Sequence, residues 1–145
     1  MNRGMTIIVK TVARLISGLI FLFGFYIICH GHLTPGGGFA GGVVVSGGFI
    51  LLFLAYGSEE AKNEIKIWRA SICESLGTFF FWLTAMIGLL GGSFFFLNIL
   101  PKGKPFHLLS AGIIPLCNLF IGIEVAASVF GIFIALSTLK RGDKS

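Results

Sequence analysis

Long runs of apolar residues alternate with short polar segments along this chain, and four of the runs are long enough to cross a bilayer. A hydrocarbon core of about 30 Å requires roughly 20 apolar residues in a helix. The pattern predicts membrane-spanning helices at residues 12–28, 39–56, 76–97 and 111–139. The runs are continuously apolar, whereas the strands of a transmembrane β-barrel place polar residues at every second position. We therefore expect an all-α membrane protein.

Composition supports a membrane location and leaves little chain for a soluble domain. Of 145 residues, 55% are hydrophobic and 12% are charged, and the mean hydropathy is +0.95. These values are typical of membrane proteins, so we expect residues 1–145 to form a single membrane domain. The basic start also suits a signal peptide, but no small-residue cleavage pattern follows Ile28 and another span comes almost at once. We expect an uncleaved first span in a multi-pass protein of a prokaryotic inner membrane.

The basic residues predict the orientation of the chain. Three groups would lie on one side of the membrane and total nine of the 11 basic residues: Arg3, Lys10 and Arg14; Lys62, Lys66 and Arg69; Lys140, Arg141 and Lys144. Only Lys102 and Lys104 fall on the other side. The positive-inside rule then places both the N-terminus and the C-terminus in the cytoplasm. Because topology explains this distribution, it implies no nucleic-acid partner.

Glu124 is the only charged residue between Lys104 and Lys140. A carboxylate at the centre of a bilayer costs a few kcal/mol and persists where it faces protein, water or an ion path. Small or polar residues such as Ala127 and Ser128 share its helix face. Two interpretations are open: Glu124 is a proton or cation relay, or it is a structural carboxyl that pairs with a neighbouring subunit, because this chain offers no Lys or Arg near that depth.

Pro115 and Asn118 lie near the outer end of the same span. Proline removes one backbone hydrogen bond, so a break there would leave carbonyl groups beside Asn118 free to coordinate a cation or water. Alternatively, Pro115 only begins the helix. Glu74 is expected at the start of the third span, where a carboxylate interacts favourably with the helix dipole.

The segment 57–74 is the one polar stretch of any length. Ile65, Trp68 and Ile72 are spaced as one apolar helix face, which indicates either a short helix in the membrane interface or a solvated loop.

Glycine dominates the turn between the first two spans. Pro35 ends the preceding helix, and Gly36, Gly37 and Gly38 allow a tight reversal before Phe39. Small residues then recur at intervals of four, which lets another helix approach closely: Gly38, Gly42 and Ser46 in the second span, and Gly88 and Gly92 in the third. We expect these faces to pack against protein.

The sequence gives little support for a metal site, a phosphate-binding loop or an enzyme active site. Cys29, His30, His32 and His107 share the outer side, but their spacing matches no standard metal site, and His30 and His32 are better explained as polar residues or proton carriers at the membrane edge. The glycine-rich turn lacks the strand and partner residues of phosphate-binding loops. No nucleophile triad or catalytic carboxylate pair is present. We therefore expect a protein that is not an enzyme and has no catalytic residues, metal or cofactor.

Two segments resemble the MnhB/MrpB subunit family of Mrp-type cation/proton antiporters: GHLTPGGGFAGG at 31–42 and GIIPLCNLFIGIEV at 112–125. The resemblance covers essentially the whole chain. It implies a small subunit of a multi-subunit complex that exchanges cytoplasmic Na+ for external H+. Similar modules occur in membrane-bound hydrogenases and related redox-driven complexes. The matching residues are His32, Pro35, Gly36, Gly37, Gly38, Phe39, Pro115, Asn118, Gly122 and Glu124.

The sequence thus predicts a membrane-embedded ion transport subunit whose partners are other subunits of an antiporter, Na+, H+ and lipid. Glu124, Asn118, Pro115 and His32 are the candidates for an ion path. Three alternatives remain: the equivalent module of a hydrogenase-type complex, a purely structural assembly subunit, and a free-standing small multidrug exporter. Such exporters carry their intramembrane acid in the first span, and the first span here has none.

Overall fold

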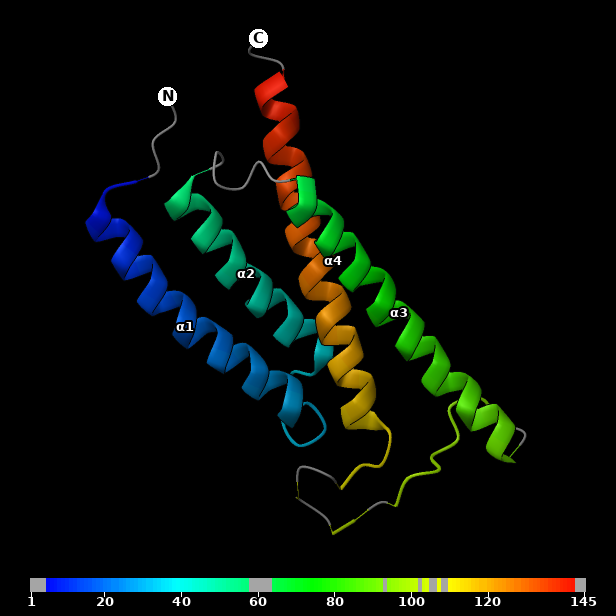
Figure 1. The fold of residues 1–145 in the computed structure, drawn as a ribbon. Helices are drawn as coiled ribbons and strands as arrows, with labels where there is room; N and C mark the ends of the chain where they lie inside the picture. The colour runs from blue at the N-terminus through cyan, green and yellow to red at the C-terminus, as the bar shows by residue number, and fades with distance from the viewer. Residues whose placement is uncertain are drawn as a thin grey trace.

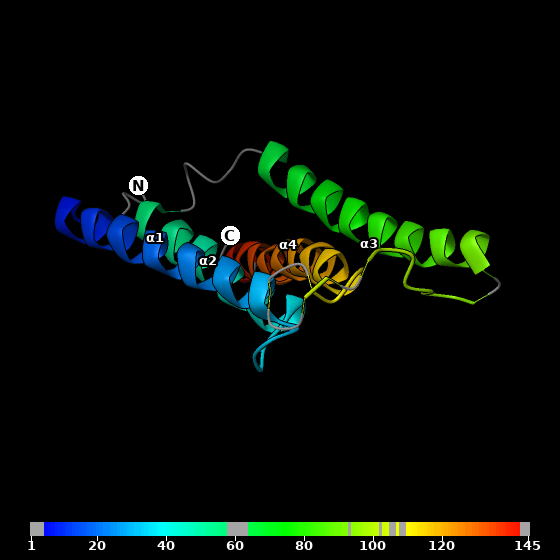
Figure 2. The same cartoon turned by 90° about the horizontal axis from the view of Figure 1, so that it is seen from below.

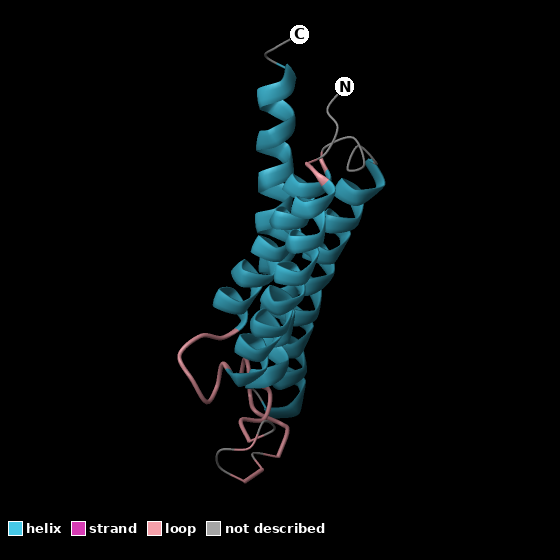
Figure 3. Cartoon of the chain, turned by 90° about the vertical axis from the view of Figure 1, so that its left-hand side faces the viewer, coloured by secondary structure: helices cyan, strands magenta, loops and turns pink. Residues whose placement is uncertain are grey.

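The computed structural model describes residues 5–57, 64–92, 94–101, 103–104, 107 and 110–142. Within these ranges the chain forms four helices and no strand: α1 (Ile7–His30), α2 (Gly38–Tyr56), α3 (Glu64–Gly92) and α4 (Ile114–Gly142) (Figures 1 and 3). Each helix contains a segment that is long and apolar enough to cross a membrane. The predicted all-α membrane fold with four spanning helices is confirmed.

The largest differences from the predicted boundaries are in α3. This helix begins at Glu64, whereas the third span was expected to begin at residue 76, because Glu, Lys, Arg and Ala continue a helix readily outside an apolar run. Residues 64–74 are therefore part of α3 and form neither a separate interfacial helix nor a loop. The helix ends at Gly92, and Phe96 then takes the left-handed backbone conformation with a φ of 59°. The side chains of Ile65 and Trp68 lie outside the described residues.

The helices pack in the spatial order α1, α2, α4, α3. Among the described residues, α4 contacts each of the other three helices, whereas α3 contacts α4 alone (Figures 1 and 2). Both termini lie at one end, and the α1–α2 and α3–α4 connections lie at the other (Figure 3). The α1–α2 pair and α3 therefore flank α4 on opposite sides. Which end faces the cytoplasm stays a prediction.

Glycines on two faces of α2 allow its close packing. Gly41 faces α1, where an added Cβ would lie 2.9 Å from the carbonyl oxygen of Gly24. Gly42 faces α4, where an added Cβ would lie 2.7 Å from the carbonyl oxygen of Gly122. Ser46, one turn further along, is fully buried. The row of small residues in the second span thus packs against α4 of the same chain.

Gly88 has a different neighbour from the one expected. An added Cβ there would meet the backbone nitrogen of Leu97 and the backbone of Phe96, in the segment that follows α3. Gly88 therefore lets the chain that follows α3 fold back onto this helix, and the atoms nearest to it belong to that segment. Gly92 is the last residue of α3, and its surroundings lie outside the described residues.

The start of α1 also differs from the sequence expectation. The helix begins at Ile7, so Lys10 and Arg14 lie in its first turns and do not precede it. Arg14 donates a hydrogen bond of 2.7 Å from Nη2 to the hydroxyl oxygen of Tyr56, the last residue of α2. The first span therefore carries two basic side chains beside the end of the second span.

Candidate functional site

The connection between α1 and α2 is a tight, hydrogen-bonded turn. The backbone N–H groups of Leu33 and Thr34 donate to the carbonyl oxygen of His30 at 2.8 and 2.9 Å. Gly37 has a φ of 100°, which glycine adopts without steric strain. Pro35 precedes this reversal and α2 starts at Gly38. The turn therefore has the tight geometry that its sequence predicts.

This turn packs directly against Asn118 of α4. An added Cβ on Gly31 would lie 2.8 Å from Asn118 Nδ2, and one on Gly37 would lie 3.6 Å from Asn118 Oδ1. An added Cβ on Gly38 would overlap the backbone carbonyl oxygen of Asn118. The two segments that stand out in the sequence are thus in contact at the end of the bundle away from the termini.

The histidines of this turn do not converge on a common site. His30 Nδ1 lies 3.0 Å from the carbonyl oxygen of Tyr26, and its ring stacks on the Tyr26 ring. His32 Nε2 lies 3.3 Å from the carbonyl oxygen of His107, which joins the turn to the α3–α4 connection. His32 Nδ1 is buried and has no hydrogen-bond partner in the described part of the chain. The histidines tie these loops to neighbouring backbone.

Pro115 begins α4. It is the second residue of the helix. Backbone N–H groups in the first turn have no acceptor within the helix, so proline is tolerated there. Two residues after Pro115, the N–H of Cys117 donates to the carbonyl oxygen of Ile113 at 3.0 Å. The helix is continuous from Ile114, so the structure shows no broken turn that frees carbonyl groups beside Asn118.

Glu124 lies at the interface between α3 and α4. An added Cβ on Gly77 of α3 would lie 2.9 Å from Glu124 Cβ, so the α3 backbone passes directly beside the acid. One turn away, the rings of Phe80 and Phe120 stack with centroids 5.4 Å apart. Glu124 is half-buried and lies next to the midpoint of the apolar segment Ile114–Ser137. The acid therefore sits near mid-span between two helices.

A second carboxylate lies on the same interface. Ser128, one turn from Glu124 on α4, donates a hydrogen bond of 2.5 Å to Glu74 Oε1 on α3. Because Gly77 is opposite Glu124 and Glu74 is three residues before Gly77, the two acids lie about one helical turn apart along the interface. We call Glu74, Gly77, Glu124 and Ser128 the carboxylate site.

The expected role of Glu74 at a helix N-terminus is wrong. The helix begins at Glu64, so Glu74 lies nearly three turns inside it, whereas dipole effects are confined to the first turn. Glu74 also lies within the membrane-crossing segment Ala70–Gly91. The one sequence feature that could have indicated a second carboxylate at this interface was Ser128. Its hydroxyl lies on the same helix face as Glu124 and can donate a hydrogen bond to a carboxylate. The pairing of α3 with α4 that brings Glu74 there has no marker in the sequence.

The carboxylate of Glu124 has free acceptor capacity. In the described part of the chain, no hydrogen bond or ion pair involves its oxygens, whereas Glu74 is held by Ser128. An ionised carboxylate presents about four lone-pair sites that accept hydrogen bonds or contact a cation. The oxygens of Glu124 are therefore available to a further partner between α3 and α4.

The structure separates the sequence candidates into two groups. Asn118 and His32 lie at the glycine turn, on the side of α4 that faces α1 and α2. Glu124 faces α3, six residues further along α4, which corresponds to about 9 Å along the helix axis and a different face. The glycine turn and the carboxylate site are therefore two distinct parts of this subunit.

Comparison with known proteins gives consistent matches. Residues 8–131 match a family model described as a domain related to the MnhB subunit of Na+/H+ antiporter. Two curated relatives named "Putative antiporter subunit mnhB2", from Staphylococcus aureus strains Newman and JH1, are each 31% identical over 144 residues and 96% of both chains. A solved chain from the membrane-bound sulfane sulfur reductase, an archaeal respiratory membrane complex, is similar with a TM-score of 0.71 and 34% identity. The alignment covers 91% of the present chain and 58% of that one.

Proposed function

Because the chain belongs to the family of domains related to the MnhB subunit of Na+/H+ antiporters, we propose that it is a small membrane subunit of a complex that exchanges Na+ for H+. The match to the curated relatives over nearly their whole length supports an equivalent role in such a complex. One observation supports the role in ion transport. Glu124 is an acid near mid-span at a helix interface, and its oxygens make no hydrogen bond or ion pair among the described residues.

In this proposal the carboxylate site forms part of the ion path. Glu124 binds either a proton or Na+, and the competition between them couples the two fluxes. Glu74, fixed by Ser128, is the neighbouring carboxyl through which the ion moves to or from Glu124. The basic residues at the end that carries both termini support a cytoplasmic location for that end. Glu74 then lies on the cytoplasmic side of Glu124.

The glycine turn has a separate role in this proposal. Asn118 and the backbone of Gly31 and Gly37 pack so closely that the turn holds α1, α2 and α4 together. His32 joins it to the α3–α4 connection through His107. We assign to this region the assembly function of the subunit at the outer membrane surface, and to Pro115 the start of α4.

A redox-driven complex is the second candidate assembly, favoured by the 34% identity to a chain of an archaeal respiratory complex. Gentle detergent extraction of the affinity-tagged chain, followed by identification of its partners, distinguishes the two. We expect antiporter-like membrane subunits without redox cofactors. Recovery of an iron–sulfur or nickel–iron subunit would instead place the chain in a redox complex, and recovery of a lone homodimer would contradict both.

Replacing Ser128 with alanine is expected to lower the exchange rate of the assembled complex several-fold. Without the hydroxyl, Glu74 loses the hydrogen bond that positions it, which is worth about 1.5–3 kcal/mol when one partner is charged. The Na+-dependent change in internal pH of inverted vesicles measures this. Ser137→Ala is the matched control, because the Ser137 hydroxyl bonds to Phe133 of its own helix. Equal rates in the two variants would remove Ser128 from the ion path.

A further inference from the structure

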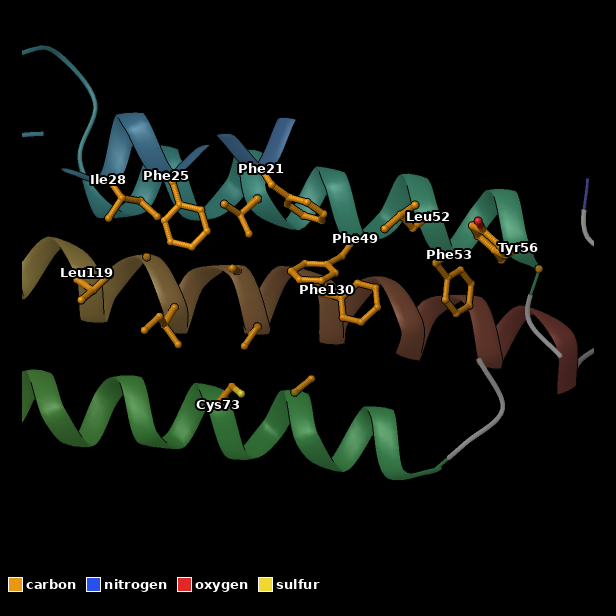
Figure 4. Close-up of a pocket in the computed structure, with 17 residues that line it drawn as sticks. Phe21, Phe25, Ile28, Phe49, Leu52, Phe53, Tyr56, Cys73, Leu119 and Phe130 are labelled. Carbon is orange, nitrogen blue, oxygen red and sulfur yellow. The ribbon is translucent and has the colours of Figure 1, made fainter. Parts of the chain in front are cut away.

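An apolar groove separates α3 from the α1–α2 pair, and α4 forms its floor. The groove encloses a cavity of about 760 Å³ (Figure 4). Its lining includes three aromatic rings: the centroid of the Phe49 ring lies 4.8 Å from that of Phe21 and 5.7 Å from that of Phe130. Its floor includes the small residues Gly122 and Ala126. No charged side chain lines the groove among the described residues, so its occupant must be apolar along most of its length.

One end of this groove is basic. Tyr56 lines the groove at that end, as Figure 4 shows, and its hydroxyl accepts a hydrogen bond of 2.7 Å from Arg14 Nη2. Lys10 Nζ lies 5.2 Å from the centroid of the Tyr56 ring, and the Arg14 guanidinium carbon lies 5.8 Å from it. Both cations therefore stand beside the same mouth of an otherwise apolar groove.

We propose that this groove binds an anionic phospholipid, with one acyl chain along α4 and the phosphate group against Lys10 and Arg14. Tyr56 would lie at the boundary between the acyl chain and the headgroup. Basic residues at the mouth of an apolar pocket between transmembrane helices are suited to anionic headgroups. This inference does not depend on the exchange of Na+ for H+.

The dimensions of the groove agree with one lipid leaflet. Along α2 its lining runs from Val45 to Tyr56, which corresponds to about 16 Å at 1.5 Å per residue. That length is about half of a 30 Å hydrocarbon core. A helix of another subunit is the less suitable occupant. It would need a width of about 10 Å and an interface rich in small residues, whereas the walls here carry aromatic rings.

Removal of the cations tests the proposal. The assembled complex is purified, incorporated into nanodiscs of phosphatidylcholine with a minor fraction of phosphatidylglycerol, and extracted again, and the retained phosphatidylglycerol is measured by mass spectrometry. We expect retention by the wild type and an affinity lowered about 5-fold for each cation removed, or about 25-fold in the Lys10→Gln/Arg14→Gln variant. The control is Lys104→Gln, which removes an exposed cation outside the four helices. Equal retention in the double variant and the control would overturn the proposal.

A second variant tests the groove itself and leaves both cations in place. Ala127 lines the groove, so Ala127→Phe fills part of it and is expected to abolish retention of phosphatidylglycerol. A photoreactive benzoylphenylalanine in place of Phe130 identifies the occupant in the assembled complex. Cross-links to phospholipid support the proposal. Cross-links to another polypeptide, in which case a partner helix fills the groove, would overturn it.

Discussion

Replacing Glu124 with glutamine in the assembled complex is expected to abolish Na+/H+ exchange, with a loss of about 100-fold or more, the scale seen when a proton-transferring side chain is removed. Glutamine has nearly the same shape, so the contact with Gly77 remains. It can neither release a proton nor carry the charge that binds Na+. The measurement is the Na+-dependent pH change in inverted vesicles from cells that lack other antiporters, taken over a range of pH.

The control for this prediction is Glu124→Asp, which keeps the acid and shortens its reach. We expect the aspartate variant to retain more exchange than the glutamine variant at every pH. Recovery of partner subunits must be equal for both. Normal assembly with unchanged exchange in Glu124→Gln would make this chain a structural subunit only.

Replacing Gly42 with leucine is expected to separate α2 from α4 and to prevent stable folding. An added Cβ would lie 2.7 Å from the carbonyl oxygen of Gly122 and 2.9 Å from Val125 Cβ. The first of these atoms belongs to the backbone of another helix and cannot move aside without moving α4. Such overpacking costs about 1–3 kcal/mol or more. The apparent melting temperature and the yield of the detergent-solubilised chain measure the effect.

Gly47 provides the matched control because it lies on the same helix and an added Cβ there meets nothing within 4 Å. We expect the Gly47→Leu chain to keep the melting temperature of the wild type. If Gly42→Leu and Gly47→Leu were equally stable, the close contact between α2 and α4 would not be present in the protein.

The number of helices could be predicted from the sequence because transfer of apolar residues into lipid dominates the energetics of each span. Their ends could not, since a helix continues past its apolar run wherever the following residues favour it, as at Glu64 to Glu74. The packing order of the helices, α1, α2, α4, α3, could not be predicted either. Lipid is as apolar as the helix surfaces, so hydrophobicity does not select which helices pair, and the glycines of α2 predict a close approach without naming the partner.

The candidate site was predictable only where one residue conflicted with its surroundings. Glu124 stood out because a charge interrupts an apolar run. Glu74 did not, because it was predicted at the edge of a span, and its partner Ser128 is more than fifty residues away in the chain. Asn118 was predicted beside a helix break at Pro115, but α4 is continuous there and Asn118 packs against the glycine turn.

An ion site at Glu124 is tested most directly by the infrared difference spectrum of the assembled complex between Na+-free and Na+-saturated buffers. If Glu124 exchanges a proton for Na+, the carbonyl band of a protonated carboxyl disappears when Na+ is added, and this change is absent in Glu124→Gln. A spectrum without any carboxyl change, or with a change that persists in Glu124→Gln, would contradict an ion site at Glu124.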